Sequence, residues 1–233
     1  MKTMIMAAGR GERMRPLTDH TPKPLLQAGG KPLIGWHIER LVAAGLRDIV
    51  INCAWLGEQL QAALGDGRQF GARLQWSPEH PALETAGGIA RALPLLGTEP
   101  FLVVNGDIWC DWNFARAPAC AQQMRHNGAQ AWLLLVDNPP HHPRGDFVLH
   151  DSGRVGEPAG TQSALTFSGV GLYTPELFTA VDAGSPAPLA PLLRQAMKHQ
   201  AVLGTRHDGA WMDIGTPQRL QALDALLQHD RSA

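Results

Sequence analysis

The chain has 233 residues, 44% of them apolar, and its 20 basic and 21 acidic residues give a formal net charge of −1. A chain of this size can bury a sizeable core without disulfides or metals. Proteins that coat nucleic acid or anionic membranes carry strongly basic surfaces, so the near-neutral charge argues against both partners. Any anionic ligand must therefore be met by a local group of basic residues.

The three cysteines, Cys53, Cys110 and Cys120, are odd in number and lack the spacing of metal ligands. They predict neither a disulfide framework nor a zinc site, and they suit a reducing compartment. The first apolar run, residues 4–8, is too short for a signal-peptide core, and the longest, residues 131–136, is too short to span a bilayer. We expect a cytoplasmic protein and assign it no oligomeric state.

Apolar runs alternate with amphipathic segments through the first 136 residues. The predicted strands are residues 3–8, 48–53, 72–77, 100–107 and 129–136, and the predicted helices include 32–45, 56–64 and 85–93. The strands are continuously apolar, which is typical of a parallel sheet covered by helices on both faces. In the first helix Ile34, Ile38 and Leu41 share one stripe, and Gly45 suits the helix end. This order indicates an open, doubly wound α/β domain with a mostly parallel sheet.

From about residue 137 the sequence changes to loop and short strands. The predicted short strands are residues 147–150, 154–158, 165–173 and 201–206, which suit a small antiparallel layer at one edge of the main sheet. Thr216 as N-cap and Pro217 at the first helical position begin a closing helix that runs to about residue 229. Its apolar stripe comprises Leu220, Leu223, Leu226 and Leu227.

The turn after the first strand combines glycines with basic residues. Gly9 and Gly11 let backbone N–H groups approach a ligand closely, and Arg13 and Lys23 supply charge for phosphates. Residues 1–31 contain six Lys or Arg and two acidic residues, a local net charge of 6 − 2 = +4. The alternative is an ordinary surface turn with solvated arginines. Three prolines around Lys23 favour the phosphate interpretation, because they restrict the backbone and reduce the entropy lost on binding.

Two familiar phosphate motifs do not match this turn. The dinucleotide fingerprint needs a third glycine where this chain has Met14, and the Walker A pattern needs a glycine where it has Leu25. Instead, "AAGRGERMRPLTDHTPKPL" resembles the signature of the sugar-1-phosphate nucleotidyltransferases, which join a nucleoside triphosphate to a sugar 1-phosphate and release pyrophosphate. Further family landmarks follow in order: "ETAGGI", "VVNGD", "GEP", "FSGVGLY" and "WMDIGTP".

The resemblance covers essentially the whole chain. It implies a single Rossmann-like nucleotidyltransferase domain over residues 1–233, with a nucleotide-binding half (1–136), a sugar-binding half (137–215) and the closing helix (216–229). The residues it implies for nucleotide binding are Ala8, Gly9, Gly11, Glu12, Arg13, Lys23, Gly87 and Gly88. Arg13, Lys23 and Asp107 would be catalytic. We expect the Glu12 side chain to point outward, because an acid beside a triphosphate would repel it.

Asp107 and Asp213 are the expected magnesium ligands. Each lies beside a glycine or an apolar strand end, and the family uses the matching carboxylates to hold Mg²⁺ against phosphates. Taken singly, either aspartate also suits a turn or a helix cap. With the metal and two cations in place, the reaction needs no protein nucleophile and no general base.

The sugar-side residues implied by the resemblance are Asn105, Gly145, Asp146, Glu157 and Gly169. For Gly145 and Gly169 a tight turn or bulge is an open alternative. Arg144, His141 and His142 are candidates for meeting a lactyl carboxylate, although a loop of this kind is more often simply solvated. Trp211 has the best claim of the tryptophans to line a site, and core packing is its alternative.

The resemblance implies UTP and a sugar 1-phosphate as substrates. The motifs resemble most closely those of short bacterial members that act on N-acetylmuramic acid 1-phosphate in cell-wall sugar recycling. The alternatives are mannose 1-phosphate with GTP, and glucose 1-phosphate with UTP or dTTP. From other classes come a regulatory subunit that only binds a sugar nucleotide, which retention of Lys23, Asp107 and Asp213 argues against, and a metal-dependent glycosyltransferase, which would not need the glycine–arginine–lysine turn.

Overall fold

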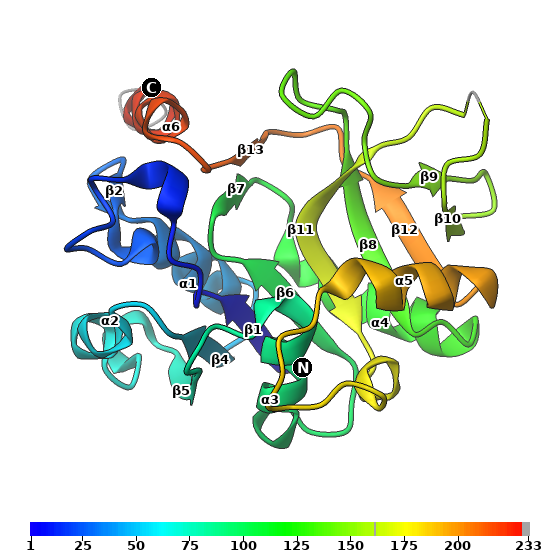
Figure 1. Ribbon diagram of the computed structural model, residues 1–233, viewed down its shortest axis with the longest axis horizontal. Coiled ribbons are helices and arrows are strands. Elements are labelled where there is room, and N and C mark those ends of the chain that lie inside the picture. Colours follow the sequence, from blue (N-terminus) through cyan, green and yellow to red (C-terminus); the bar gives the residue numbers. More distant parts are fainter. Residues whose placement is uncertain (161, 230–233) are drawn as a thin grey trace.

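The computed structural model describes residues 1–160 and 162–229 (Figure 1). The strands are β1 (Thr3–Met6), β2 (Gln27–Ala28), β3 (Lys31–Pro32), β4 (Asp48–Cys53), β5 (Arg73–Pro78), β6 (Phe101–Asn105), β7 (Ile108–Cys110), β8 (Ala131–Val136), β9 (Val148–Leu149), β10 (Val155–Gly156), β11 (Thr166–Tyr173), β12 (Val202–Arg206) and β13 (Trp211–Asp213). The helices are α1 (Leu33–Ala43), α2 (Gly57–Leu64), α3 (Glu84–Leu96), α4 (Ala117–His126), α5 (Leu189–Lys198) and α6 (Pro217–His229).

Seven strands form the central sheet, in the order β12-β8-β11-β6-β1-β4-β5. Strand β1 pairs in parallel with β4 and β6, β4 with β5, and β8 with β12. Strand β11 runs antiparallel to both of its neighbours, β6 and β8. The predicted doubly wound, mostly parallel α/β fold is confirmed.

The second half of the chain differs from the expected edge layer in one respect. The segments predicted as short outer strands at 165–173 and 201–206 are β11 and β12, which belong to the central sheet. Strand β11 lies in its interior, where residues 168–173 are all buried. Its inner position depends on pairing with β6, which lies far away in the sequence. The separate antiparallel pair from this region is β9 with β10.

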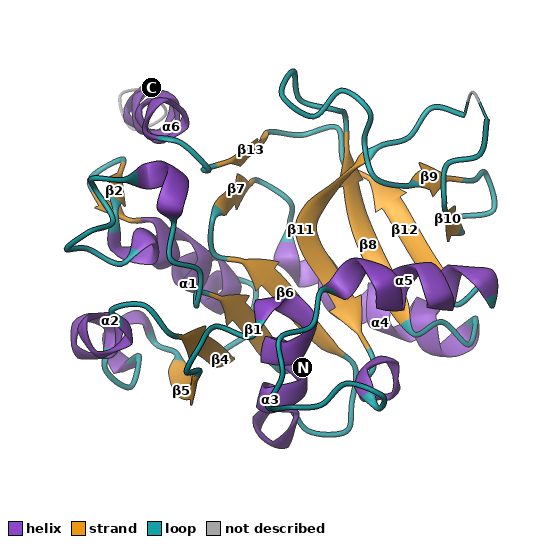
Figure 2. Ribbon diagram, in the orientation of Figure 1, coloured by secondary structure: helices purple, strands orange, loops and turns teal. Residues whose placement is uncertain are grey.

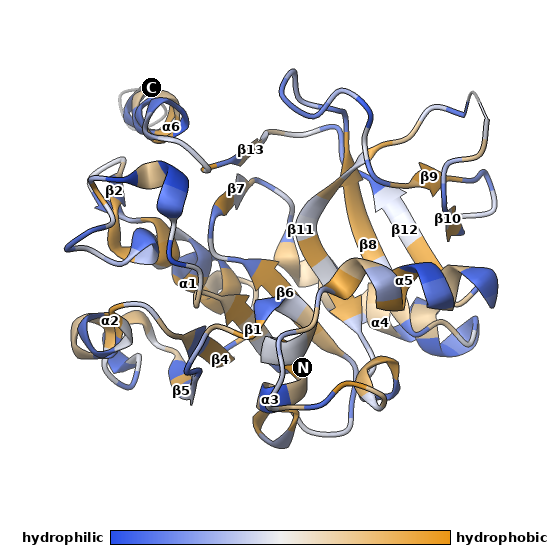
Figure 3. Cartoon of the chain, viewed as in Figure 1, coloured by the Kyte–Doolittle hydropathy of each residue, from blue (hydrophilic) through white to orange (hydrophobic). Residues whose placement is uncertain are grey.

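Helices cover both faces of the sheet (Figure 2). Side chains of α1, α2 and α4 pack in one buried cluster with Ile5, Ile51 and Val104. Side chains of α3 and α5 pack in a second cluster with Met4 and Val103. Successive residues of one strand therefore enter opposite cores, which explains why the central strands are apolar along their whole length (Figure 3).

Helix α6 packs over the amino-terminal part of the chain (Figure 1). Thr216 caps it, since its Oγ1 accepts from the Arg219 N–H at 3.3 Å. A third apolar cluster joins the helix to the turn and to the β2–β3 hairpin: Met14, Leu26, Ala28, Leu33, Ile214, Leu220, Leu223 and Leu227. The expected stripe on this helix is thus correct except at Leu226, which is 38% exposed.

No helix in the described ranges is long and apolar enough to cross a membrane.

Candidate active site

Two adjoining cavities, of about 380 Å³ and about 400 Å³, open at the carboxyl edge of the sheet. The first is lined by Met6, Ala7, Ala8, Gly9, Gly11, Glu12, Arg13, Lys23, Pro24, Asn52, Glu79, Ala82, Glu84, Thr85, Asn105, Gly106, Asp107 and Gly215. The second is lined by Arg13, Asn105, Asp107, Ile108, Pro139, His141, His142, Thr166, Phe167, Ser168, Gly169, Trp211 and Asp213. Arg13, Asn105 and Asp107 line both cavities. The strand ends of β1, β4, β5 and β6 therefore converge where open α/β sheets bind ligands.

The turn after β1 depends on Gly11. Its φ of +69° lies in the left-handed region, and a Cβ there would be 3.0 Å from Thr18 Cγ2 and 3.2 Å from Lys23 Cβ. The Thr18 hydroxyl donates to the Gly11 carbonyl at 2.9 Å, which fixes the turn from the other side. Gly9 also lines the first cavity, and a Cβ there would have no heavy atom within 4 Å. Gly11 thus shapes the turn, whereas Gly9 leaves space beside it.

Lys23 enters the site from a short 3-10 turn, Lys23–Leu25, which follows Pro22. It is only 8% exposed, and its Nζ lies 2.8 Å from Asp107 Oδ2. A lysine so deeply buried requires a charged or strongly polar partner, and Asp107 provides it here. Lys23 and Asp107 are 84 residues apart in the sequence. The structure brings them together, as the sequence predicted.

The other basic residues of the turn have different surroundings. Arg10 stacks 3.8 Å from the Trp55 ring centroid, and Arg15 pairs with Asp19 at 2.7 Å. Lys31 pairs with Glu39 at 2.6 Å. The local charge of the sequence is therefore largely compensated, and Arg13 and Lys23 are the basic side chains that line the cavities.

Glu12 agrees with the expectation that its side chain turns outward. The side chain is 72% exposed and lies 3.3 Å from Arg10 Nε.

A short antiparallel ladder brings Asp213 beside Asp107. Strand β13 pairs with β7 so that Asp213 is opposite Ile108, and the Ile214 N–H donates to the Asp107 carbonyl at 2.7 Å. Arg219 Nη2 lies 3.1 Å from Asp213 Oδ2, and His141 Nε2 lies 2.8 Å from Oδ1. That Oδ1 is buried, and His141 is the neighbour that faces it. Two carboxylates at neighbouring positions fit a hard divalent cation.

A buried polar network beneath the first cavity was missed from the sequence. The Asn52 side chain accepts from the Ala7 N–H at 2.7 Å and donates to Glu79 Oε1 at 2.7 Å. The other Glu79 oxygen accepts from the Leu83 N–H at 2.8 Å. A polar residue at the carboxyl end of an apolar strand, as in "DIVINC", and an acid directly after the next strand are signals that could have found both.

Gly87 and Gly88 lie within α3 and are buried. A Cβ on Gly88 would be 2.6 Å from Glu79 Oε1, and one on Gly87 would be 2.5 Å from the Ser185 carbonyl. Close packing therefore explains both glycines. The residues of this segment that line the first cavity are Glu84, which has a φ of +58°, and Thr85.

On the sugar side, Asn105 and Gly169 meet at the second cavity. Gly169 has a φ of +83°, and a Cβ there would be 2.8 Å from Asn105 Nδ2. The β11–β8 register shifts between Phe167 and Gly171, so Gly169 also lies at the irregularity that its alternative interpretation predicted. Trp211 lines the same cavity, and its Nε1 donates to the Ser168 carbonyl at 2.8 Å.

Three other predicted sugar-side residues line neither cavity. Gly145 has a φ of +64° in the loop before β9. The carboxylate of Asp146 accepts from the Phe167 N–H at 2.8 Å, and Glu157 Oε2 lies 3.4 Å from Arg194 Nε. Their roles toward a sugar stay predictions, whereas His141 and His142 do line the second cavity.

His37 of α1 lies beneath the start of β7. It is 3% exposed, and burial lowers its pKa to about 4, against a smaller opposing effect of its hydrogen bond with the Ile108 backbone. The imidazole is therefore neutral at pH 7 and supports the strand that follows Asp107.

A family model described as nucleotidyl transferase matches residues 2–229. The chain belongs to the nucleotidyl transferase family. It is 56% identical over 229 residues to an N-acetylmuramate alpha-1-phosphate uridylyltransferase of Neisseria meningitidis, covering 97% of this chain and 98% of that one. It is 36% identical over 232 residues to a protein of the same name from Caulobacter vibrioides, covering 96% of each.

Solved structures of other proteins share the fold of this chain. A Bacillus anthracis protein crystallised with a sucrose superposes with a TM-score of 0.84 over 98% of this chain and 95% of that one, at 23% identity. HddC from Yersinia pseudotuberculosis, complexed with GMP-PN, gives 0.78 over 97% and 98%, at 18% identity. At these identities the likeness concerns the fold.

Proposed function

We propose that this chain transfers a uridylyl group from UTP to N-acetylmuramic acid 1-phosphate and releases pyrophosphate. Its identity to the two relatives named for that reaction supports the choice of base and sugar. One observation carries the reaction class: the two cavities meet at Arg13, Asn105 and Asp107. A nucleotide in the first cavity and a sugar phosphate in the second would bring their phosphates together at a pair of charged side chains.

The amino-terminal turn binds the triphosphate in this proposal. Backbone groups at Ala8, Gly9, Gly11 and Glu12 surround the phosphates, and Arg13 and Lys23 neutralise their charge. Lys23 is preorganised because its turn is buried, so little entropy is lost when it exchanges Asp107 for a phosphate oxygen.

Asp107 and Asp213 would hold Mg²⁺. When bound, the ion would neutralise charge on the α-phosphate and on the departing pyrophosphate. Lys23 pairs with Asp107 and Arg219 with Asp213, and both cations would become available to anionic oxygens once a metal ion takes their place.

The second cavity orients the attacking phosphate. A sugar-phosphate oxygen is already anionic, so attack on the α-phosphorus requires positioning in line and needs no general base. Asn105 lines both cavities and is suited to bond a sugar hydroxyl or acyl group beside the reacting atoms. His141, which lies at the Asp213 end of that cavity, and His142 are suited to a lactyl carboxylate.

The base would lie against the opposite end of the first cavity. Glu84 and Thr85 line that end, with Asn52 and Glu79 beneath it. Gly87 and Gly88 act here through packing, since they allow α3 to approach Glu79 closely. A cytoplasmic location would supply UTP and is consistent with the three free cysteines.

A substrate panel tests the proposal. Pyrophosphate release is followed with UTP, GTP and dTTP against the 1-phosphates of N-acetylmuramic acid, mannose and glucose, with and without a chelator. We expect the highest kcat/KM for UTP with N-acetylmuramic acid 1-phosphate, and loss of turnover with the chelator that Mg²⁺ restores. In reverse, pyrophosphate and the UDP sugar should regenerate UTP. Preference for GTP with mannose 1-phosphate would overturn the substrate assignment, and binding without turnover would indicate a regulatory subunit.

A further inference from the structure

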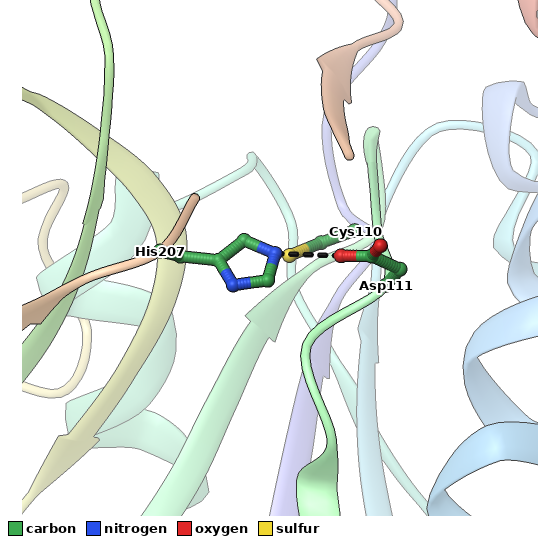
Figure 4. A group of neighbouring side chains, drawn as sticks. All are labelled: Cys110, Asp111 and His207. Atoms are coloured by element: carbon green, nitrogen blue, oxygen red, sulfur yellow. Dashed lines mark hydrogen bonds and ion pairs between the residues drawn. The ribbon is translucent and has the colours of Figure 1, made fainter. Parts of the chain in front are cut away.

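Three side chains of different chemical type meet outside both cavities: Cys110 of β7, Asp111 directly after it, and His207 directly after β12 (Figure 4). His207 Nε2 lies 2.6 Å from Asp111 Oδ1, and the ligand atoms of all three residues lie within 4.8 Å of one another. Cys110 is buried and Asp111 is exposed. The proposed transfer reaction leaves all three unused.

We propose that Cys110, Asp111 and His207 bind a transition-metal ion, for which Zn²⁺ is the best match. Thiolate, imidazole and carboxylate are all zinc ligands, and three protein ligands leave a fourth position for water. Tetrahedral zinc with bonds of about 2.0–2.3 Å places its ligand atoms roughly 3.3–3.8 Å apart. The cluster reaches that geometry when the sulfur moves inward and the His207–Asp111 pair opens slightly. Mg²⁺ and Ca²⁺ prefer oxygen ligands only, so this site differs in selectivity from the Asp107–Asp213 pair.

The surrounding backbone supports a site at this point. The Asp111 N–H donates to the Ala210 carbonyl at 3.0 Å, and the His207 N–H donates to the Leu135 carbonyl at 2.8 Å. A Cβ on Gly209 would lie 2.4 Å from Asp111 Oδ1 and 2.7 Å from His207 Nε2. A side chain at residue 209 would therefore collide with these two ligand atoms, and glycine avoids that collision.

Metal binding at Cys110 must overcome the protonation of its thiol. Burial raises the pKa of the thiol to about 11, while a hydrogen bond with the Trp112 backbone and the positive charge of Arg40, which donates to the Cys110 and Trp112 carbonyls, oppose that rise. The thiol is therefore protonated at pH 7 without metal. An ion must displace this proton, and Arg40 stabilises the resulting thiolate.

The position of the cluster gives it a consequence for the catalytic side. In the β7–β13 ladder Cys110 is opposite Trp211, and Ile108 is opposite Asp213. The cluster thus lies at one end of the β7–β13 ladder, and Asp107 and Asp213 lie at the other end. A bound ion would link segment 207–210 to β7 and stabilise the ladder, which should raise the thermal stability of the chain.

Cobalt substitution tests the site, because Co²⁺ bound to a thiolate gives a near-ultraviolet charge-transfer band that oxygen-bound Co²⁺ lacks. The full chain is titrated with Co²⁺ in a phosphine reductant with excess Mg²⁺, and Zn²⁺ is then added. We expect one band per chain that Zn²⁺ displaces, together with a higher melting temperature. Cys110→Ser should abolish the band, and Asp111→Asn and His207→Gln should each weaken Co²⁺ binding by at least about tenfold.

The matched control is Cys120→Ser, which removes a half-buried thiol outside the cluster and should leave the band unchanged. Should Cys110→Ser fail to fold, the Asp111 and His207 variants decide the result. Absence of a charge-transfer band, its persistence in Cys110→Ser, or unchanged affinity in both Asp111→Asn and His207→Gln would overturn the proposal. None of these outcomes depends on the substrates of the transfer reaction.

Discussion

The amino-terminal turn, residues 9–24, and the loop of residues 137–146 flank the same pair of cavities but are stabilised differently. The turn rests on buried groups: Met14 is 0% exposed, Thr18 1% and Lys23 8%. The loop is tied down by contacts of half-exposed groups, such as His142 with Asp146 at 3.0 Å. Exposed ion pairs of this kind contribute about 1 kcal/mol or less. The turn is therefore the more firmly supported of the two, and under the proposed function it would carry the phosphate chemistry while the loop would contact the sugar.

Among the variants that test this comparison, Asp107→Asn should lower turnover most. The amide keeps the shape of the side chain and can still accept from Lys23, but it loses the charge that would hold a divalent cation. We expect turnover to fall by at least about a thousandfold, with an unchanged circular dichroism spectrum. Asp137→Asn, which removes an exposed carboxylate paired with Arg206, is the control. Turnover near the parent level in folded Asp107→Asn would remove this residue from the site.

Lys23→Ala should lower turnover by about a hundredfold, because the buried ammonium is preorganised to stabilise developing negative charge. Lys31→Ala removes the same charge from the same part of the chain. Lys31 pairs with Glu39 and lies over the Trp36 ring, away from the cavities, so its loss should change turnover little. Pyrophosphate release is measured for both variants, and equal losses would mean that general charge, rather than position, is responsible.

The buried His37 should make the stability of the folded protein sensitive to acid. His37 has a pKa of about 4 in the folded state and an ordinary value of 6.5 when unfolded, so the unfolded chain binds the extra proton between these values. The contribution of His37 to the free energy of unfolding is greatest above pH 6.5 and decreases by about 3 kcal/mol as the pH falls toward 4. Urea unfolding at pH 7.5 and pH 4.5 measures this loss. His37→Leu should reduce the pH dependence, and an unchanged slope would assign it to other groups.

Gly88→Ala and Gly9→Ala should separate packing from ligand approach. A Cβ on Gly88 meets Glu79 Oε1 at 2.6 Å, so we expect a loss of about 1–3 kcal/mol in the free energy of unfolding. A Cβ on Gly9 meets nothing within 4 Å, so stability should change by less than about 0.5 kcal/mol, while the KM for UTP rises because the methyl group enters the phosphate space. If Gly9→Ala instead lowered stability and Gly88→Ala instead raised the KM for UTP, Gly9 would be the packing residue and Gly88 the residue beside the ligand.

Glu157→Gln should have the smallest effect. Glu157 lines neither cavity and pairs with Arg194 at the surface, so the KM for the sugar phosphate should change by less than about fivefold. Asn105→Ala, which removes a side chain that lines both cavities, is the comparison and should raise that KM further. A large increase with Glu157→Gln, confined to the sugar phosphate, would return this carboxylate to the sugar site.

The sequence predicted best those features that depend on neighbouring residues. Gly11 with the prolines around Lys23 defined a turn, Thr216 and Pro217 defined the start of α6, and strands apolar on both faces defined the parallel sheet. In each case the physical cause lies within a few residues of its effect. Whole-chain resemblance then linked Asp107 to Asp213, which local pattern alone left as two turn residues.

Features that depend on distant residues were missed or misplaced. Strand β11 was expected at an edge because nothing local reveals that it pairs with β6. The role of Gly88 toward the base stays a prediction, whereas its packing against Glu79, nine positions earlier and on a different element, was not foreseen. The Cys110–Asp111–His207 cluster had no spacing motif, since His207 is 96 residues from Asp111. Each of these contacts forms only when the sheet is complete.

Helix α6 has a consequence for the order in which the chain becomes active. The underside of the turn, including Met14 and Leu26, is covered by Leu220, Leu223 and Leu227, and the Gly29 N–H donates to Asp224 at 2.7 Å. The turn thus obtains its lasting support from a helix that is synthesised much later than the turn itself. A nascent chain that lacks residues 217–229 would expose this apolar underside, so it should not capture nucleotide before translation has passed that point.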